Sequence, residues 1–226
     1  MLKICLGRHC ALKCNLSRPS GRNPESRHGR TGIEQKGVTG LFHGDHTAPD
    51  VESRERYCYQ ESSRLKKRSK GYGMDGEREE NRLQLGQIQI RDPYVYVDQE
   101  RRRYLLFGTT DKDCWNPPGT GFDCYVSTDL SRWSGPFAAF RPPRGFWADR
   151  NFWAPEVHAY GNRYYMLASF KSPHRSRGTQ ILVAERPEGP YLPHSHGPVT
   201  PADWECLDGT LHVDDESAPW IIFCHE

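Results

Sequence analysis

The chain has 226 residues, enough to bury a hydrophobic core without disulfides or a structural metal, so a mini-protein is excluded. Hydrophobic residues make up only 35% and charged residues 27%, with a net charge of +2, which indicates that part of the chain does not pack. No apolar run reaches the ~18 residues of a membrane span, and Arg8 interrupts the apolar start before a secretory signal forms, so we expect a cytoplasmic protein with no membrane partner.

The first third of the chain differs in composition from the rest. Residues 1–73 carry 15 Lys and Arg against 7 Asp and Glu, a net +8, whereas the remaining residues carry 16 against 22, a net −6. All six tryptophans lie in the second part. Low hydrophobicity with an excess of like charge is typical of disorder. We therefore expect residues 1–73 to be a disordered upstream extension, with Met74 as the natural start.

Two features of this extension have functional alternatives. Cys5, Cys10 and Cys14 stand near His9, but they lack the paired C-x2-C spacing of zinc sites, so we expect no metal and no cofactor. The basic run over residues 64–70 fits a nucleic-acid patch, an import signal or a solvated tail. No aromatic residue interleaves these charges, which favours the solvated tail and argues against a nucleic-acid partner.

From about residue 83 the pattern alternates with period two and is rich in aromatic and β-branched residues, which predicts an antiparallel all-β domain over residues 74–226. A strand, a polar turn and a second strand recur, with Gly161 and Asn162 as one hairpin turn. The residues between these hairpins repeat as well, and the spacing is typical of propeller blades. The three predicted blades lie near residues 83–140, 147–198 and 202–226.

An acidic residue opens the first strand in each predicted blade: Asp92, Glu156 and Asp208. First strands line the axis of a propeller, so these side chains are expected to converge at one end of it. Three carboxylates in one pocket favour catalysis, since packing alone does not gather them.

These segments carry a resemblance to a known family. Asp92-Pro93-Tyr94, Trp153-Ala154-Pro155-Glu156 and Leu207-Asp208-Gly209-Thr210, in this order and spacing, resemble the first three blades of glycoside hydrolase family 43 over residues 83–226. The resemblance implies a five-bladed β-propeller, here truncated to about three blades. It also implies an inverting arabinofuranosidase- or xylosidase-like enzyme that hydrolyses arabinose-, xylose- or galactose-containing glycans.

The same resemblance implies residue roles. Asp92 is similar to the general base, and Asp208 to the aspartate that tunes and orients the general acid. The family's acid is a Glu about one blade further on, so we expect blades four and five to be missing and catalysis to be incomplete in this chain. Glu226 and Glu205 are the candidates for the acid that remain, and Glu156 is expected to bind substrate hydroxyls.

Aromatic side chains near the blade openings are candidates for a sugar platform: Trp115, Phe122, Trp147, Phe152 and Trp153. For Trp147 and Trp153 a place in the core is an equal alternative, and for Trp133, Trp204 and Trp220 the core is favoured. Cys114, Cys124, Cys206 and Cys224 show no disulfide framework and are expected as reduced thiols.

Three functions remain open at this point. The first is a glycosidase acting on an oligosaccharide or polysaccharide, a monomer when full-length. The second is a carbohydrate-binding propeller that lacks the acid. The third is an interaction propeller whose aligned carboxylates are a coincidence, which outward-pointing carboxylates would favour.

Overall fold

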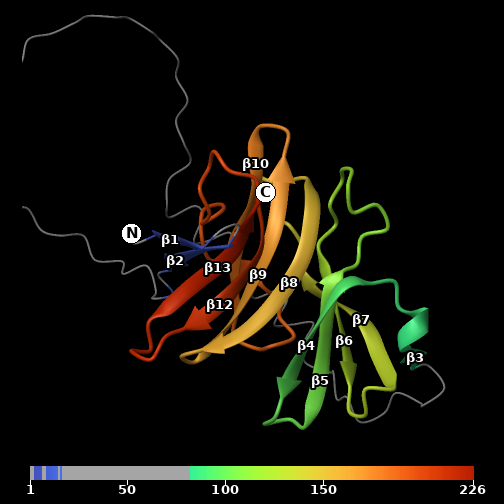
Figure 1. Cartoon of the computed structure of the whole chain (residues 1–226). Coiled ribbons are helices and arrows are strands. Elements are labelled where there is room, and N and C mark those ends of the chain that lie inside the picture. The colour runs from blue at the N-terminus through green and yellow to red at the C-terminus, as the bar shows by residue number, and fades with distance from the viewer. Residues whose placement is uncertain (1–2, 7–8, 15, 17–81) are drawn as a thin grey trace, which may run out of the picture. The chain divides into compact units, whose positions relative to one another are not determined.

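The structure, a computed structural model, describes residues 3–6, 9–14, 16 and 82–226, which belong to one compact unit. Apart from one short 3₁₀ turn, the regular elements of these residues are β-strands, arranged in three antiparallel sheets (Figure 1). None of the described segments contains a helix of the length and apolarity that crossing a membrane requires. The all-β prediction is confirmed.

The first sheet, called blade one here, is built from residues 83–140. Its order is β3-β7-β6-β5-β4. The elements are β3 (Leu83–Gln84), the 3₁₀ turn η2 (Leu85–Gln87), β4 (Arg91–Asp98), β5 (Arg103–Thr109), β6 (Phe122–Ser127) and β7 (Arg132–Phe140).

Blade two is a four-stranded sheet in the order β11-β10-β9-β8. Its strands are β8 (Arg150–Tyr160), β9 (Arg163–Ser172), β10 (Arg175–Ala184) and β11 (Leu192–Pro193). The two-residue turn between β8 and β9 falls on Gly161 and Asn162, as the sequence predicts. Gly161 has a φ of 57°, which a residue without a Cβ adopts without strain.

Blade three combines two distant parts of the chain. Its order is β1-β2-β13-β12, from β1 (Lys3–Leu6), β2 (His9–Lys13), β12 (Cys206–Val213) and β13 (Pro219–His225). In Figure 1 the blue hairpin β1–β2 lies along the red strand β13. The expectation that residues 1–73 are disordered is therefore wrong for this hairpin. The rest of that range, with Met74 and the basic run 64–70, lies outside the described residues.

Composition misled the prediction because it was averaged over residues 1–73, whereas six of the nine residues in the two strands of this hairpin are apolar. Leu12, Cys14 and Leu16 are buried in a cluster with residues of blades two and three. The hydroxyl of Tyr165 donates to the carbonyl of Leu16 at 2.8 Å. The edge of β13 thus gains backbone partners over Trp220–Cys224, which a sheet edge otherwise leaves unpaired.

The core lies between blades, and β9 shows how a period-two strand builds it. Met166, Ala168 and Phe170 belong to the cluster that blade two shares with blade one. Tyr165 and Leu167, which alternate with them, belong to the cluster shared with blade three. Both faces of β9 are buried between neighbouring blades. This explains why apolar residues occupy both sides of the strand and do not alternate with polar ones.

Arg103 forms a buried ion pair within blade one and a second ion pair with blade two. The Arg103 Nε lies 2.8 Å from the Asp98 Oδ2, and its Nη2 lies 2.8 Å from the Glu188 Oε2. Burial raises the pKa of Asp98, but hydrogen bonds and charge from Arg103 and Arg101 outweigh it, and the net pKa is lowered. Asp98 ends β4, whereas Asp92 lies near its start, so this pair is at the opposite end of β4 from the predicted site.

Candidate functional site

The first strand of each blade breaks register with its partner near one end. A residue at such a break has a positive φ in every blade: 48° at Asp92, 43° at Ala154 and 52° at Asp208. Blade two has a second break, where Asn151 has a φ of 52°. Bulges of this kind redirect a side chain, and aspartate tolerates the left-handed backbone better than most residues. Ala154, not Glu156, holds the equivalent place in blade two. Glu156 lies in the middle of β8, so the expectation that it opens its strand is corrected.

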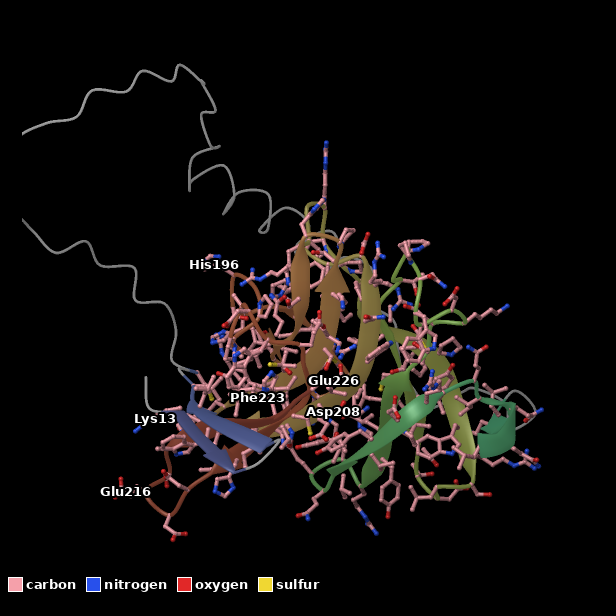
Figure 2. All side chains as sticks on the ribbon, turned by 45° about the horizontal axis from the view of Figure 1, so that its top comes forward. Lys13, His196, Asp208, Glu216, Phe223 and Glu226 are labelled. Carbon is pink, nitrogen blue, oxygen red and sulfur yellow. The ribbon has the colours of Figure 1, made fainter. Side chains whose placement is uncertain are left out.

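The structure brings the predicted carboxylates together around Asp208. The pKa of Asp208 is raised, and the largest cause is its partial burial away from water. The negative charge of Asp92 is the next cause, and the charges of Glu156 and Glu226 raise the pKa further. Arg177 acts in the opposite direction. Figure 2 shows Asp208 and Glu226 in the same region of the molecule. The carboxylates are therefore near enough for their charges to interact, as the alignment of first strands predicts.

Glu156 belongs to a polar network between blades two and three. Its Oε2 lies 3.2 Å from His158 Nε2, which lies 3.4 Å from Thr210 Oγ1. Burial raises the pKa of Glu156, but hydrogen bonds from His158 and Thr210 outweigh this, and the net pKa is lowered. The Tyr94 ring lies 5.8 Å from the His158 ring. Glu156 is thus held ionised, which fits a hydroxyl acceptor.

A second charged cluster lies beside Asp208, and its centre is an arginine that the sequence prediction missed. Arg177, on β10, is only 6% exposed. Its backbone N–H donates to Glu205 Oε2 at 3.0 Å, and its guanidinium pairs with Glu226. The guanidinium carbon lies 4.8 Å from the centre of the Trp153 ring. Nothing in the local sequence distinguishes Arg177 from the exposed Arg175 two residues earlier.

The two candidates for the general acid are both paired with cations. Glu205 Oε1 accepts a hydrogen bond from Lys171 Nζ at 2.8 Å. Burial raises the pKa of Glu205, but Lys171 and Arg177 together lower it below its usual value. An acid must hold its proton near neutral pH, so Glu205 does not fit that role. Glu226 is paired with Arg177, although its side chain is 57% exposed.

Trp115 and Trp153 form an aromatic corner beside this cluster. Their rings meet edge to face at 4.7 Å, and Trp115 is 59% exposed. The Trp153 Nε1 donates to the carbonyl of Cys114 at 2.6 Å, and the side-chain amide of Asn151 reaches the same loop. The Arg91 guanidinium lies 5.8 Å from the Trp115 ring. An exposed, fixed indole of this kind can stack on a sugar face.

Other predicted platform residues lie in the core. Phe122 and Phe152 are buried at 0% and 1% exposure, in the cluster between blades one and two, so their assignment to substrate is corrected. Large apolar side chains on inward positions of both sheets fill that interface before any ligand can. Trp147 packs against the same cluster, and its Nε1 donates to Gln180 at 2.5 Å. Trp133 is buried as expected.

No group of three or more His, Cys, Asp or Glu side chains is arranged to hold a metal among the residues that the structure describes. The side chains of Cys5, His9 and Cys10 lie outside this set. Cys14 is buried in the core, and burial raises the pKa of its thiol to about 11. The four cysteines of the second part are free thiols: Cys114, Cys124, Cys206 and Cys224.

Comparison with solved structures places this arrangement among glycoside hydrolases. The endo-arabinase from Bacteroides thetaiotaomicron is 35% identical, with a TM-score of 0.57 over 64% of this chain and 48% of its own. A thermostable family-43 glycoside hydrolase is 26% identical, with a TM-score of 0.51 over 59% of this chain and 41% of its own. The chain therefore spans about half the length of these enzymes. The comparison with curated proteins found no match.

The β-xylosidase RS223 shares the fold, with a TM-score of 0.50 at 18% identity over 63% of this chain and 46% of its own. The three blades correspond to part of a five-bladed β-propeller, and their first strands carry the residues of the resemblance. The family model described as glycosyl hydrolases family 43 matches residues 85–226. The chain belongs to glycosyl hydrolases family 43.

Proposed function

We propose that the chain is part of an enzyme that hydrolyses O-glycosidic bonds in arabinose-, xylose- or galactose-containing glycans with inversion of configuration. The observation that carries this proposal is the convergence of Asp92 and Glu156 on Asp208, from the first strands of three blades. A catalytic pocket needs such a set, whereas an interaction propeller with outward carboxylates does not. Family membership supports the same conclusion.

Asp92 is proposed as the general base. It is exposed near the start of β4, where a water molecule and a sugar can reach it. In an inverting hydrolase the base removes a proton from water on one face of the sugar, while an acid on the other face protonates the leaving oxygen. The two carboxyl groups stand about 6.5–9.5 Å apart, which leaves room for the water.

Asp208 is proposed to tune the acid by its charge. A carboxylate close to an acid raises the pKa of that acid by repulsion, which keeps the acid protonated near neutral pH. Asp208 must itself be ionised to do this. Burial and the neighbouring carboxylates raise the pKa of Asp208, and Arg177 opposes this and favours its ionised form. The proposed acid comes from the part of the relatives' length that this chain does not span.

Trp115 and Trp153 are proposed to bind the substrate by stacking. Arabinan is the first substrate to test, because the relative that is 35% identical is an endo-arabinase. Xylan and galactan are the matched alternatives, as the family resemblance implies.

A second candidate function is carbohydrate binding without hydrolysis. It follows if no further acid joins the site, since Glu205 and Glu226, the candidate acids of this chain, are both paired with cations. In this case the site keeps its carboxylates and its aromatic corner. Sugars then bind to it and are not hydrolysed.

The test uses protein from the complete gene, incubated with debranched arabinan, xylan and galactan. Products are followed by reducing-end assay, and their anomeric configuration by proton NMR within the first minutes. Hydrolysis with inversion supports the proposal. Retention of configuration contradicts the roles of Asp92 and Asp208, and binding by calorimetry without any product supports the second candidate.

A further inference from the structure

Arg177 is a buried cation beside several carboxylates of the site. Glu205, Glu226 and Asp208 all lie near it, from the segment before β12, the end of β13 and the start of β12. Its side chain also covers one face of Trp153, at 4.8 Å from the ring centre. One residue of blade two thus contacts both the carboxylates of blade three and the aromatic corner of the proposed sugar site.

Packing alone does not explain an arginine in this place. A buried guanidinium is costly unless anions compensate it, and an apolar side chain of similar size fills such a space at no electrostatic cost. Arg177 Nε is buried and has no hydrogen-bond partner among the described residues, so its fork is not fully used by its two glutamates. The arrangement therefore favours a role in holding the site over a role in stability.

We propose that Arg177 is a positioning residue of this site, which fixes the Trp153 ring and keeps the charges around Asp208 in balance. This inference rests on the proposed function, because it assigns a purpose to the same pocket. Arg177 need not touch the substrate. It acts through Trp153, which stacks on the sugar, and through Asp208, which tunes the acid.

The two effects have different physical origins and can be separated. Stacking on Trp153 needs the planar guanidinium, whereas the action on Asp208 needs only a positive charge. Asp208 is faced by Asp92 from β4, Glu156 from β8, Arg177 from β10 and Glu226 beyond β13. Arg177 is the cation in this set, so its loss leaves Asp208 among carboxylates.

The experiment compares Arg177→Gln with Arg177→Lys. Arg177→Gln removes the charge, so Asp208 loses its ionised form at a higher pH, and the acidic limb of the kcat profile moves to higher pH. We expect kcat to fall about 10- to 100-fold, as for a misplaced catalytic group. Arg177→Lys keeps the charge, so its acidic limb stays in place while KM rises because the stacking on Trp153 is lost.

Arg186→Gln is the matched control. Arg186 is a surface arginine that follows β10 and is 56% exposed, with Glu188 at 3.9 Å, so its removal leaves the profile as in the wild type. If Arg177→Gln folds and keeps the wild-type acidic limb and KM, the positioning role is overturned. If Arg177→Gln does not fold, a wild-type KM in Arg177→Lys overturns the part that concerns Trp153.

A direct titration separates this inference from the proposed function. Asp208 is followed by ¹³C NMR in labelled protein, with Asp208→Asn to assign its signal. A titration that moves to higher pH in Arg177→Gln but not in Arg177→Lys supports the inference even if the wild type hydrolyses no glycan. Titration at the same pH in the wild type and Arg177→Gln overturns the charge role, whether or not hydrolysis is seen.

Discussion

The carboxylates of Asp92 and Asp208 lie close enough for the charge of one to act on the other: after partial loss of water, Asp92 is the strongest influence that raises the pKa of Asp208. The two residues occupy equivalent places in blades one and three. Each has a positive φ, 48° and 52°, at a break in the pairing of a first strand. The same local backbone, repeated in two blades, thus places the two carboxylates within range of each other's charge.

Asp92→Asn is expected to lower hydrolysis at least about 100-fold in the complete protein, because a general base contributes some 10²- to 10⁴-fold. The thermal midpoint should stay nearly unchanged, since asparagine has the same volume and tolerates the positive φ. Initial rates on arabinan and a melting curve test this together. Activity above about one hundredth of the wild type contradicts the assignment.

Asp208→Asn is expected to alter the alkaline limb of the pH profile, not only its height. Without the charge of Asp208 the general acid loses its proton at a lower pH, so activity falls earlier as the pH rises. Steady-state rates between pH 4 and about pH 9 resolve the two limbs. An unshifted alkaline limb shows instead that Asp208 only binds sugar.

The same substitution is expected to stabilise the fold at neutral pH. A carboxyl group whose pKa is raised by folding is penalised when ionised, so Asp208→Asn removes a penalty. The gain exists above the raised pKa of Asp208 and disappears as the pH falls below the ordinary value of 3.8. Melting temperatures of both proteins at neutral and acidic pH measure it.

Asp214→Asn is the control of opposite sign in the same blade. Hydrogen bonds, led by that from the Trp220 indole, lower the pKa of Asp214. Its contribution is therefore present above the ordinary pKa and lost as the pH falls through the lowered one. Asp214→Asn should destabilise the protein at neutral pH, and stabilisation by both substitutions is inconsistent with this account.

Arg103→Ala is expected to destabilise the protein by about 3–5 kcal/mol, because it leaves the buried Asp98 carboxylate without its partner. Arg101→Ala removes an arginine that is 43% exposed and also faces Asp98, and should cost about 0–1 kcal/mol. Urea unfolding of the two variants provides the comparison. Equal losses would show that burial of the pair contributes nothing.

Leu12→Asp tests the N-terminal hairpin. Leu12 is 5% exposed on β2 and packs in the cluster below β13, so a charge there should destabilise blade three by about 2–5 kcal/mol. Lys13→Ala changes the exposed neighbour, which lies 5.9 Å from the Trp220 ring, and should cost about 1 kcal/mol or less. Identical melting of Leu12→Asp and the wild type indicates that β2 does not pair with β13 in solution.

The sequence by itself determined the fold class, the three blades' first strands and the family. Period-two alternation and short turns are local signals, and Gly161 with Asn162 marks a turn wherever it lies in space. The sequence also predicted Asp92 and Asp208 as site residues, because each lies at the start of a strand pattern that recurs once in every blade. These features depend only on neighbours along the chain.

Tertiary structure decided which side chains each blade buries. Phe122, Phe152 and Trp153 are all aromatic residues near the blade openings, yet the first two fill the interface of blades one and two while Trp153 contacts Trp115 and Arg177. Arg175 and Arg177 lie two residues apart, and only the second is buried, because Glu205 and Glu226 of another blade compensate its charge. Burial and pairing depend on partners far away in the sequence, and no local pattern contains them.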